Sequence, residues 1–222
     1  MRGEMIFLLC SDIPVLAAAT IAAAGYRRYE KTLQYFCIFV IFSALIQLLA
    51  LTLSLRHTNN MPLLHIYTPV SLWLLTLFYQ KLLKKAINSQ ILITVAILFI
   101  LFSVINSIFI QNIFTFNSYS LTSASILLII ITIFTFIISL DKKNINLVKE
   151  YNLNTIGWVN AGLLIYHTST LLIFYFSNYL VKYYNFKINS YIWIMHSIVS
   201  MVMYCCFIIG LWKQLRAYRL QR

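Results

Sequence analysis

Charged side chains are scarce in this sequence. Only 10% of its 222 residues are charged, whereas 61% are hydrophobic, and the mean hydropathy is +0.84. Soluble domains carry about 25% charged residues, so a soluble fold of this size would leave much of its apolar surface in water. The composition excludes an ordinary soluble protein and indicates that lipid is the solvent for much of the chain.

Long polar segments are missing too. No polar stretch approaches the roughly 50 residues that the smallest independent domains need. We therefore expect one domain that uses the whole chain, residues 1–222.

The cysteines form no recognisable site. There are four, all inside apolar runs, and none belongs to a C-x-x-C pair. This pattern excludes a zinc ribbon and a disulfide framework. We interpret Cys10, Cys37, Cys205 and Cys206 as small buried hydrophobic residues.

Acidic residues are rare, with 5 against 17 basic ones. The basic residues stand in short clusters between apolar runs, and aromatic residues do not alternate with them as in a nucleic-acid groove. We therefore expect no nucleic-acid partner and attribute the positive charge to orientation in a membrane.

Seven apolar runs are present, and each is long enough to cross a hydrocarbon core of about 30 Å at about 1.5 Å per residue. They predict an all-α, polytopic membrane protein with seven transmembrane helices, in which sequential helices are antiparallel neighbours. The runs lie at about 5–25, 32–55, 62–82, 90–110, 119–140, 155–177 and 189–212.

The basic residues are distributed unevenly between the two sides of this bundle. Alternate connections and chain ends carry 13 and 4 of the 17 basic residues. Since positive charge is retained in the cytosol, the pattern predicts the N-terminus outside and the C-terminus inside. We expect a multi-pass protein of a bacterial cytoplasmic (inner) membrane.

Polar residues within the runs concentrate in the outer half under this topology. Asp12 is the only acidic residue well inside an apolar run. Such groups are costly in lipid and face the bundle interior, so we predict a polar cavity open to the outside, with Asp12 within reach of a histidine. The expected ligand-binding residues are Asp12, Gln47, His65, Tyr67, Asn106, His167, Thr168, His196 and Ser200.

Three interpretations of this polar set remain open. The side chains hydrogen-bond between helices, or they line a ligand-binding cavity, or some of them hold a metal. Three imidazoles and a carboxylate suit Zn²⁺ with a polarised water, although no spacing motif supports the site because its ligands come from four helices. That metal set is Asp12, His65, His167 and His196.

Several residues in the N-terminal half carry a family resemblance. They are Pro14, the basic turn from Arg27 to Lys31, and Asn59-Asn60 followed by Leu64-His65-Ile66-Tyr67-Thr68. Together with the His196 region, they resemble a group of uncharacterised seven-helix membrane proteins common in Bacteroidota. Gln47 departs from the acidic residue expected at its position, which argues against proton coupling. The resemblance implies a topology and no established activity.

The function expected from these features is a non-enzymatic sensor or receptor-like module that binds a small or lipid-like ligand. Its partners would be the bilayer and a membrane signalling protein, contacted by the basic tail Lys213 to Arg222, which serves equally well as an orientation anchor. The alternatives are a zinc-dependent membrane hydrolase of lipid substrates and a small transporter.

Overall fold

A computed structural model describes residues 10–140, 153–184 and 186–220, and within these ranges the chain is helical, without strands. This confirms the predicted all-α fold class. The elements are α2 (Ile13–Gly25), the 3₁₀ turn η1 (Tyr26–Arg28), α3 (Lys31–Leu55), α4 (Met61–Leu82), α5 (Ser89–Ile105), the π-helical turn η2 (Asn106–Ile110), α6 (Ser118–Leu140), α7 (Leu153–Tyr183) and α8 (Phe186–Leu220).

Six helices are long and apolar enough to cross a membrane: α3, α4, α5 with η2, α6, α7 and α8. α2 is a further helix of the bundle, with 13 residues in Ile13–Gly25. The first predicted run began at residue 5, and residues 1–9 lie outside the described part of the chain. The helices therefore suit a multi-pass membrane protein.

The last two helices are longer than the apolar runs predicted. α7 has 31 residues and α8 has 35, whereas the runs covered 155–177 and 189–212. Hydropathy marks only the part of a helix that tolerates lipid, while backbone hydrogen bonds continue the helix through polar residues such as Asn178. At about 1.5 Å per residue α8 is about 52 Å long, so it extends past a hydrocarbon core of about 30 Å.

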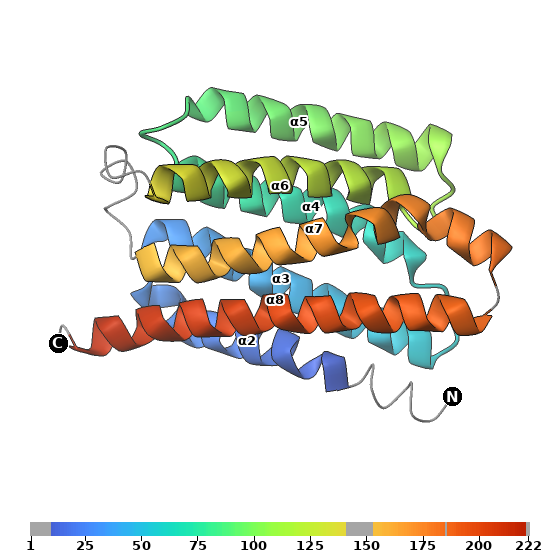
Figure 1. Cartoon of the computed structure of the whole chain (residues 1–222), viewed down its shortest axis with the longest axis horizontal. Helices are drawn as coiled ribbons and strands as arrows, with labels where there is room; N and C mark the ends of the chain where they lie inside the picture. The colour runs from blue at the N-terminus through green and yellow to red at the C-terminus, as the bar shows by residue number, and fades with distance from the viewer. Residues whose placement is uncertain (1–9, 141–152, 185, 221–222) are drawn as a thin grey trace.

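The helices form a ring with one helix outside it. Each helix of the ring packs on the next in the order α2, α3, α4, α6, α7, α8, and α8 packs on α2 to close the ring. α5 lies at the edge of the bundle, packed chiefly on α4 and only sparsely on α6 (Figure 1). We expected each helix to pack beside the next helix in the sequence, but α5 and α6 make few contacts with each other.

The bundle has two ends that differ in charge. One end, which we call the basic end, holds η1, the α4–α5 turn and the C-terminal part of α8. Its basic residues are Arg27, Arg28, Lys81, Lys84, Lys85, Lys213 and Arg216. The far end holds the α3–α4 connection, η2 and the α7–α8 connection. In Figure 1 the basic end is on the left and the far end on the right.

Aromatic packing fills the interior of the ring towards the basic end. Phe36, Phe78, Tyr79 and Phe207 are completely buried. The rings of Phe36 and Phe207 meet edge to face, with centroids 4.9 Å apart, which joins α3 to α8.

The turn between α2 and α3 is fixed against α8 by Tyr29. Its ring packs so closely on Gly25 that a Cβ there would overlap it, and its hydroxyl donates to the Leu211 carbonyl at 2.9 Å. Burial raises the pKa of the Tyr29 hydroxyl, so this donor keeps its proton. Three helices are thereby joined at the basic end.

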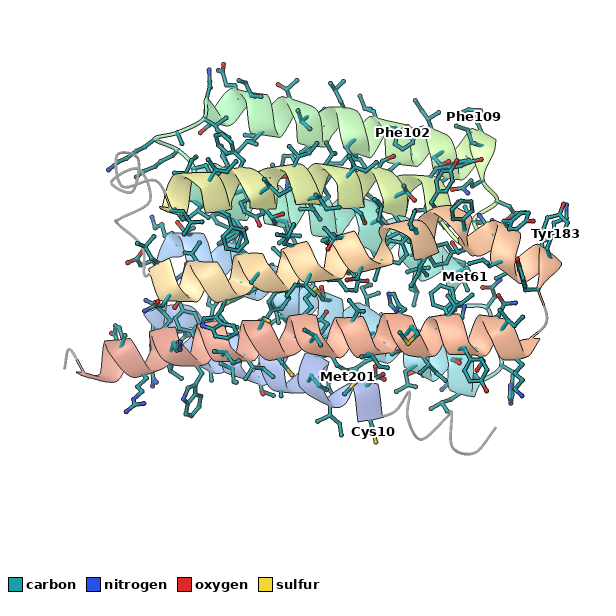
Figure 2. The ribbon with its side chains drawn as sticks, viewed as in Figure 1. Cys10, Met61, Phe102, Phe109, Tyr183 and Met201 are labelled. Carbon is teal, nitrogen blue, oxygen red and sulfur yellow. The ribbon has the colours of Figure 1, made fainter. Side chains whose placement is uncertain are left out.

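Large apolar side chains cover the outside of the bundle. Phe109, labelled at the end of η2 in Figure 2, is 78% exposed, and Leu172 on α7 is 67% exposed. Such surfaces are costly in water and cost nothing in lipid. The outward faces therefore agree with the sequence-based expectation of a membrane protein.

Candidate functional site

Asp12 pairs with Gln47. Asp12 is the N-cap residue of α2 and is buried, and the Gln47 side chain on α3 donates from Nε2 to its Oδ1 at 2.9 Å. An amide supplies a donor that a second carboxylate would lack. Among the described residues no histidine hydrogen-bonds or ion-pairs with Asp12, contrary to the sequence-based expectation, because Gln47 meets the carboxylate instead.

Tyr67, Tyr166, Tyr204, Ser43 and His196 form what we call the tyrosine cluster. The Tyr166 hydroxyl lies 3.0 Å from His196 Nε2, and the Tyr67 hydroxyl lies 3.3 Å from Ser43 Oγ. Tyr204 is buried on α8 close to Tyr67, Tyr166 and Ser43. The cluster joins α3, α4, α7 and α8.

Sequence reasoning missed Tyr204 and Ser43 as members of this cluster. A signal was available for Tyr204, because it follows His196 by eight residues and therefore lies on the same face of α8. Ser43 precedes Gln47 by one turn of α3 and shares its side of that helix for the same reason.

His167 and Thr168 are adjacent in α7 but have different surroundings. His167 Nδ1 lies 3.0 Å from Ser125 Oγ on α6. Thr168 is exposed, and its hydroxyl donates within its own helix to the Leu164 carbonyl at 2.7 Å. Ser200 is half-buried on α8, one turn from His196. The structure thus places His167 between helices and Thr168 on the outer surface.

His65 is held by the α5–α6 connection. Its Nδ1 lies 2.8 Å from Ser107 Oγ in η2, and its Nε2 lies 3.2 Å from the Thr115 carbonyl. The imidazole is buried in α4, so both ring nitrogens have partners. His65 therefore fastens α4 to the far end of α5 and is separate from Asp12 and His167.

A buried group of neutral polar side chains joins α5 to α6 at the far end. We call it the amide hub; its members are Asn106, Gln111, Asn117, Ser118 and Ser120. Asn106 Nδ2 lies 2.9 Å from Gln111 Oε1, 3.0 Å from Asn117 Oδ1 and 3.1 Å from Ser120 Oγ. Asn106, Asn117 and Ser120 are completely buried. The hub also reaches α7, because Asn178 donates to Ser118 Oγ at 3.1 Å.

The four candidate metal ligands have separate partners. Asp12 meets Gln47, His65 meets Ser107, His167 meets Ser125, and His196 meets Tyr166, as described above. Within residues 10–140, 153–184 and 186–220 no group of three or more His, Cys, Asp or Glu side chains is placed to hold a metal ion. A zinc-activated water therefore has no support from the geometry.

A hollow is present elsewhere, where α5 stands apart from α4 and α6. It is a cavity of about 300 Å³, and a second hollow of about 410 Å³ continues from it between α5 and α6. We call the two together the crevice. The first is lined by Leu72, Thr76, Tyr79, Ile87, Leu92, Val95, Ala96, Leu127, Leu128, Ile130, Ile131 and Phe134.

Sequence reasoning gave no indication of the crevice. The second hollow is lined by Val95, Leu98, Phe99, Phe102, Ser123, Ile126 and Leu127, so it shares Val95 and Leu127 with the first. In a sequence, such residues are indistinguishable from residues that face lipid directly. Only the sparse packing of α5 on α6 distinguishes them.

One wall of the crevice is connected to the opposite side of the ring. Tyr79 lines the cavity from α4, and its hydroxyl donates to Asn160 Oδ1 on α7 at 2.8 Å. Asn160 Nδ2 in turn donates to the Thr132 carbonyl on α6 at 2.8 Å. Tyr79, Asn160 and Thr132 are buried. Two hydrogen bonds therefore connect the Tyr79 side chain in the cavity wall to α7 and, through Asn160, to α6.

Comparison with protein families, with curated proteins and with solved structures finds no match to this chain. The family resemblance drawn from Pro14, the basic turn and the His65 region stays a prediction. Two features of the molecule bear on its function: the hydrogen-bonded polar residues towards the far end and the apolar crevice beside α5.

Proposed function

We propose that this chain is a receptor-like, non-enzymatic membrane module that binds a lipid-like ligand in the crevice between α4, α5 and α6. The observation that carries the proposal is an apolar cavity of about 300 Å³ with Tyr79 in its wall. Because Tyr79 is hydrogen-bonded to α7, the ligand site is linked to the rest of the ring.

The lining selects an apolar ligand. Apart from Thr76 and the Tyr79 ring, the walls of the cavity of about 300 Å³ are aliphatic or phenylalanine side chains. A polar ligand would lose hydrogen bonds to water there without replacing them, which costs several kcal/mol for each group. A hydrocarbon chain loses nothing and gains the dispersion contacts that an empty crevice lacks.

The polar residues towards the far end have a supporting role in this proposal. Asp12, His65, His167 and His196 each have a hydrogen-bonding partner on another element. Interhelical hydrogen bonds of this kind stabilise membrane bundles by about 0.6 kcal/mol each on average. They hold the frame against which α5 can be displaced by a ligand.

A route for a signal starts at Tyr79. Displacement of its ring by a bound chain would strain the hydrogen bond to Asn160 and shift α7, which packs extensively on α8. A receptor of this kind needs two arrangements with different ligand affinity. The basic C-terminal part of α8, which extends past the hydrocarbon core, is the contact that we propose for a signalling partner.

The proposed orientation puts the basic end in the cytosol, in a bacterial inner membrane, because positive charge is retained there. A reporter active only in the cytosol, fused after Arg222, is expected to give signal, and a reporter active only in the periplasm is expected to do so at Asn117. The reverse pattern would overturn the orientation.

Filling the crevice tests the ligand site. Val95 lines both hollows and is 38% exposed, so Val95→Trp places an indole in the crevice with little disturbance of the core. Ile97, on the same helix and 47% exposed, lines neither hollow, so Ile97→Trp is the matched control. The measurement is photo-crosslinking of a diazirine-bearing fatty acid to the purified protein, with the labelled peptide identified by mass spectrometry.

We expect Val95→Trp to abolish labelling of α5 and α6 peptides and Ile97→Trp to leave it unchanged. Equal labelling of both variants and the unmodified chain would contradict the ligand site. Thermal unfolding in detergent confirms that both variants are folded before they are compared.

A further inference from the structure

We infer that the crevice holds one acyl chain of an anionic phospholipid, taken from the membrane leaflet at the basic end, with its headgroup phosphate beside Lys81, Lys84 and Lys85. This inference rests on the proposed function and specifies the ligand of the same site. Length, charge and access argue for it in turn.

The crevice is elongated along the helix axes, as an acyl chain requires. Its lining runs along α5 from Leu92 to Phe102 and along α6 from Ser123 to Phe134. At about 1.5 Å per residue these stretches are about 15 Å and 17 Å long. The first cavity, with Ile130, Ile131 and Phe134, lies in the half of α6 nearer the basic end, and the second hollow continues from it towards Ser123, so a chain that enters from the basic end can extend along both.

The charge at the mouth of the crevice suits a phosphate. Ile87 and Leu92 line the cavity where α5 begins, and exposed Lys84 and Lys85 precede Ile87 by three and two residues. Exposed Lys81 lies on the last turn of α4, beside the same turn. Basic groups between transmembrane helices on the cytoplasmic side bind anionic headgroups in this way.

The α4–α5 turn that carries these lysines is ordered by its own hydrogen bonds. The backbone N–H groups of Ala86 and Ile87 donate to the Leu83 carbonyl at 2.8 and 2.9 Å. The Asn88 side chain accepts from the Gln90 N–H at 3.0 Å and caps α5. The basic side chains are therefore presented by a structured turn at a constant place relative to the cavity.

Access favours a lipid over a ligand from water. The amide hub joins α5 to α6 at the far end, so a ligand cannot enter along the helix axes from that side. α5 lies at the edge of the bundle, and crevice residues such as Val95, Leu98 and Ile130 are 38%, 60% and 60% exposed on its outer side. The opening thus faces the surrounding bilayer.

Lipid retention is the experiment that tests this inference. The full chain is reconstituted in nanodiscs of phosphatidylcholine or of a phosphatidylglycerol–phosphatidylcholine mixture, and lipids retained after mild detergent release are measured by native mass spectrometry. We compare the unmodified chain with K81Q/K84Q/K85Q. The triple variant R56Q/K182Q/K187Q is the matched control, since it removes three positive charges near the far end.

The unmodified chain is expected to retain phosphatidylglycerol at least about tenfold over phosphatidylcholine, since each lysine near an anionic surface contributes roughly a fivefold gain. K81Q/K84Q/K85Q is expected to lose this preference and to retain phosphatidylcholine as before, whereas the control keeps the preference.

Two outcomes overturn the inference while the proposed function stands: retention of both lipids equally by the unmodified chain, or equal loss of preference in both triple variants. In contrast, Val95→Trp tests the crevice itself with either lipid. If that variant retains lipid unchanged, the proposed function fails and the headgroup assignment fails with it.

Discussion

The two ends of the α5–α6 pair are held differently. At the far end, Asn106 and its neighbours join the helices through three side-chain contacts of 2.9–3.1 Å, all buried. Towards the basic end the same helices separate around a cavity of about 300 Å³ lined by apolar side chains. One helix pair is thus fastened by polar groups at one end and separated by a crevice at the other.

The difference reflects what drives helix association in a bilayer. Apolar side chains gain little from leaving lipid for protein, since lipid tails are as apolar as leucine. Polar side chains have no partner in lipid, so they hold helices together wherever they meet. A membrane protein can therefore retain a stable crevice between apolar helix faces, provided that polar contacts fasten the same helices elsewhere.

The π-helical turn η2 lies at the fastened end. Asn106 opens this turn, and its carbonyl accepts from the Gln111 N–H at 2.7 Å. π-helical turns are rare and occur frequently at functional sites. Here the turn directs the Asn106 side chain into the amide hub, which fixes the far end of α5. If a lipid widened the crevice, α5 would pivot about this fixed end and its basic end would move.

The largest expected effect comes from breaking the fastened end. Asn106→Leu removes the donor shared by Gln111, Asn117 and Ser120 and leaves their oxygens buried without it. We expect a loss of unfolding free energy of about 2–4 kcal/mol, from the three lost contacts, one to α6 and two to the α5–α6 connection, and the unpaired groups that remain. Thermal and denaturant unfolding in detergent micelles measure it.

Gln90→Leu is the control for Asn106→Leu. Gln90 is an exposed amide side chain in the first turn of the same helix, and we expect its loss to change the unfolding free energy by less than about 0.5 kcal/mol. Equal unfolding of the Asn106 variant and the unmodified chain would show that the amide hub does not fasten α5.

The helical fold class and the positions of most spanning helices were predictable from the sequence because they depend on one-dimensional features. Apolar run length determines which segments can span a bilayer, and the starts of α3, α4, α5 and α6 lie within one residue of the predicted runs. The ends of α7 and α8 were placed too early, since a helix continues where hydropathy has already fallen. The position of α5 outside the ring has no one-dimensional signal at all.

The candidate site was predictable only as a set of residues. The sequence singled out Asp12, Gln47, His65, His167 and His196 because polar groups in apolar runs are costly. Their pairing depends on how helices are rotated against one another, which one sequence does not reveal. The crevice was invisible, because residues around a hollow have the same composition as residues that face lipid.

A smaller effect is expected from the wall of the crevice. Tyr79→Phe keeps the ring that lines the cavity and removes the hydroxyl that donates to Asn160. Loss of one buried hydrogen bond costs about 1 kcal/mol of unfolding free energy. Because the shape is kept, we expect lipid retention within about twofold of the unmodified chain by that same argument.

The same variant separates binding from signalling. In the unmodified chain, added phosphatidylglycerol is expected to speed amide hydrogen exchange in α7, because the bound chain displaces the Tyr79 ring and strains its hydrogen bond to Asn160. In Tyr79→Phe the lipid still binds but α7 exchange no longer responds. A normal exchange response in the variant would contradict the Tyr79–Asn160 route.

The smallest change in unfolding free energy is expected at Thr168. This residue and its neighbour His167 lie on two different faces of α7, one towards lipid and one towards α6. His167 contacts Ser125 on α6, whereas the Thr168 hydroxyl donates only to carbonyls of its own helix. Thr168→Val keeps the shape and deletes a hydroxyl that joins no second helix, so we expect a change of less than about 0.5 kcal/mol.

Ser125→Ala deletes an interhelical partner and leaves a buried ring nitrogen unpaired, for which about 1–2 kcal/mol is expected. Unfolding of both variants in the same detergent measures the difference. If Thr168→Val proves as costly as Ser125→Ala, the outer face of α7 is itself covered by another protein chain, and the assignment of that face to lipid is wrong.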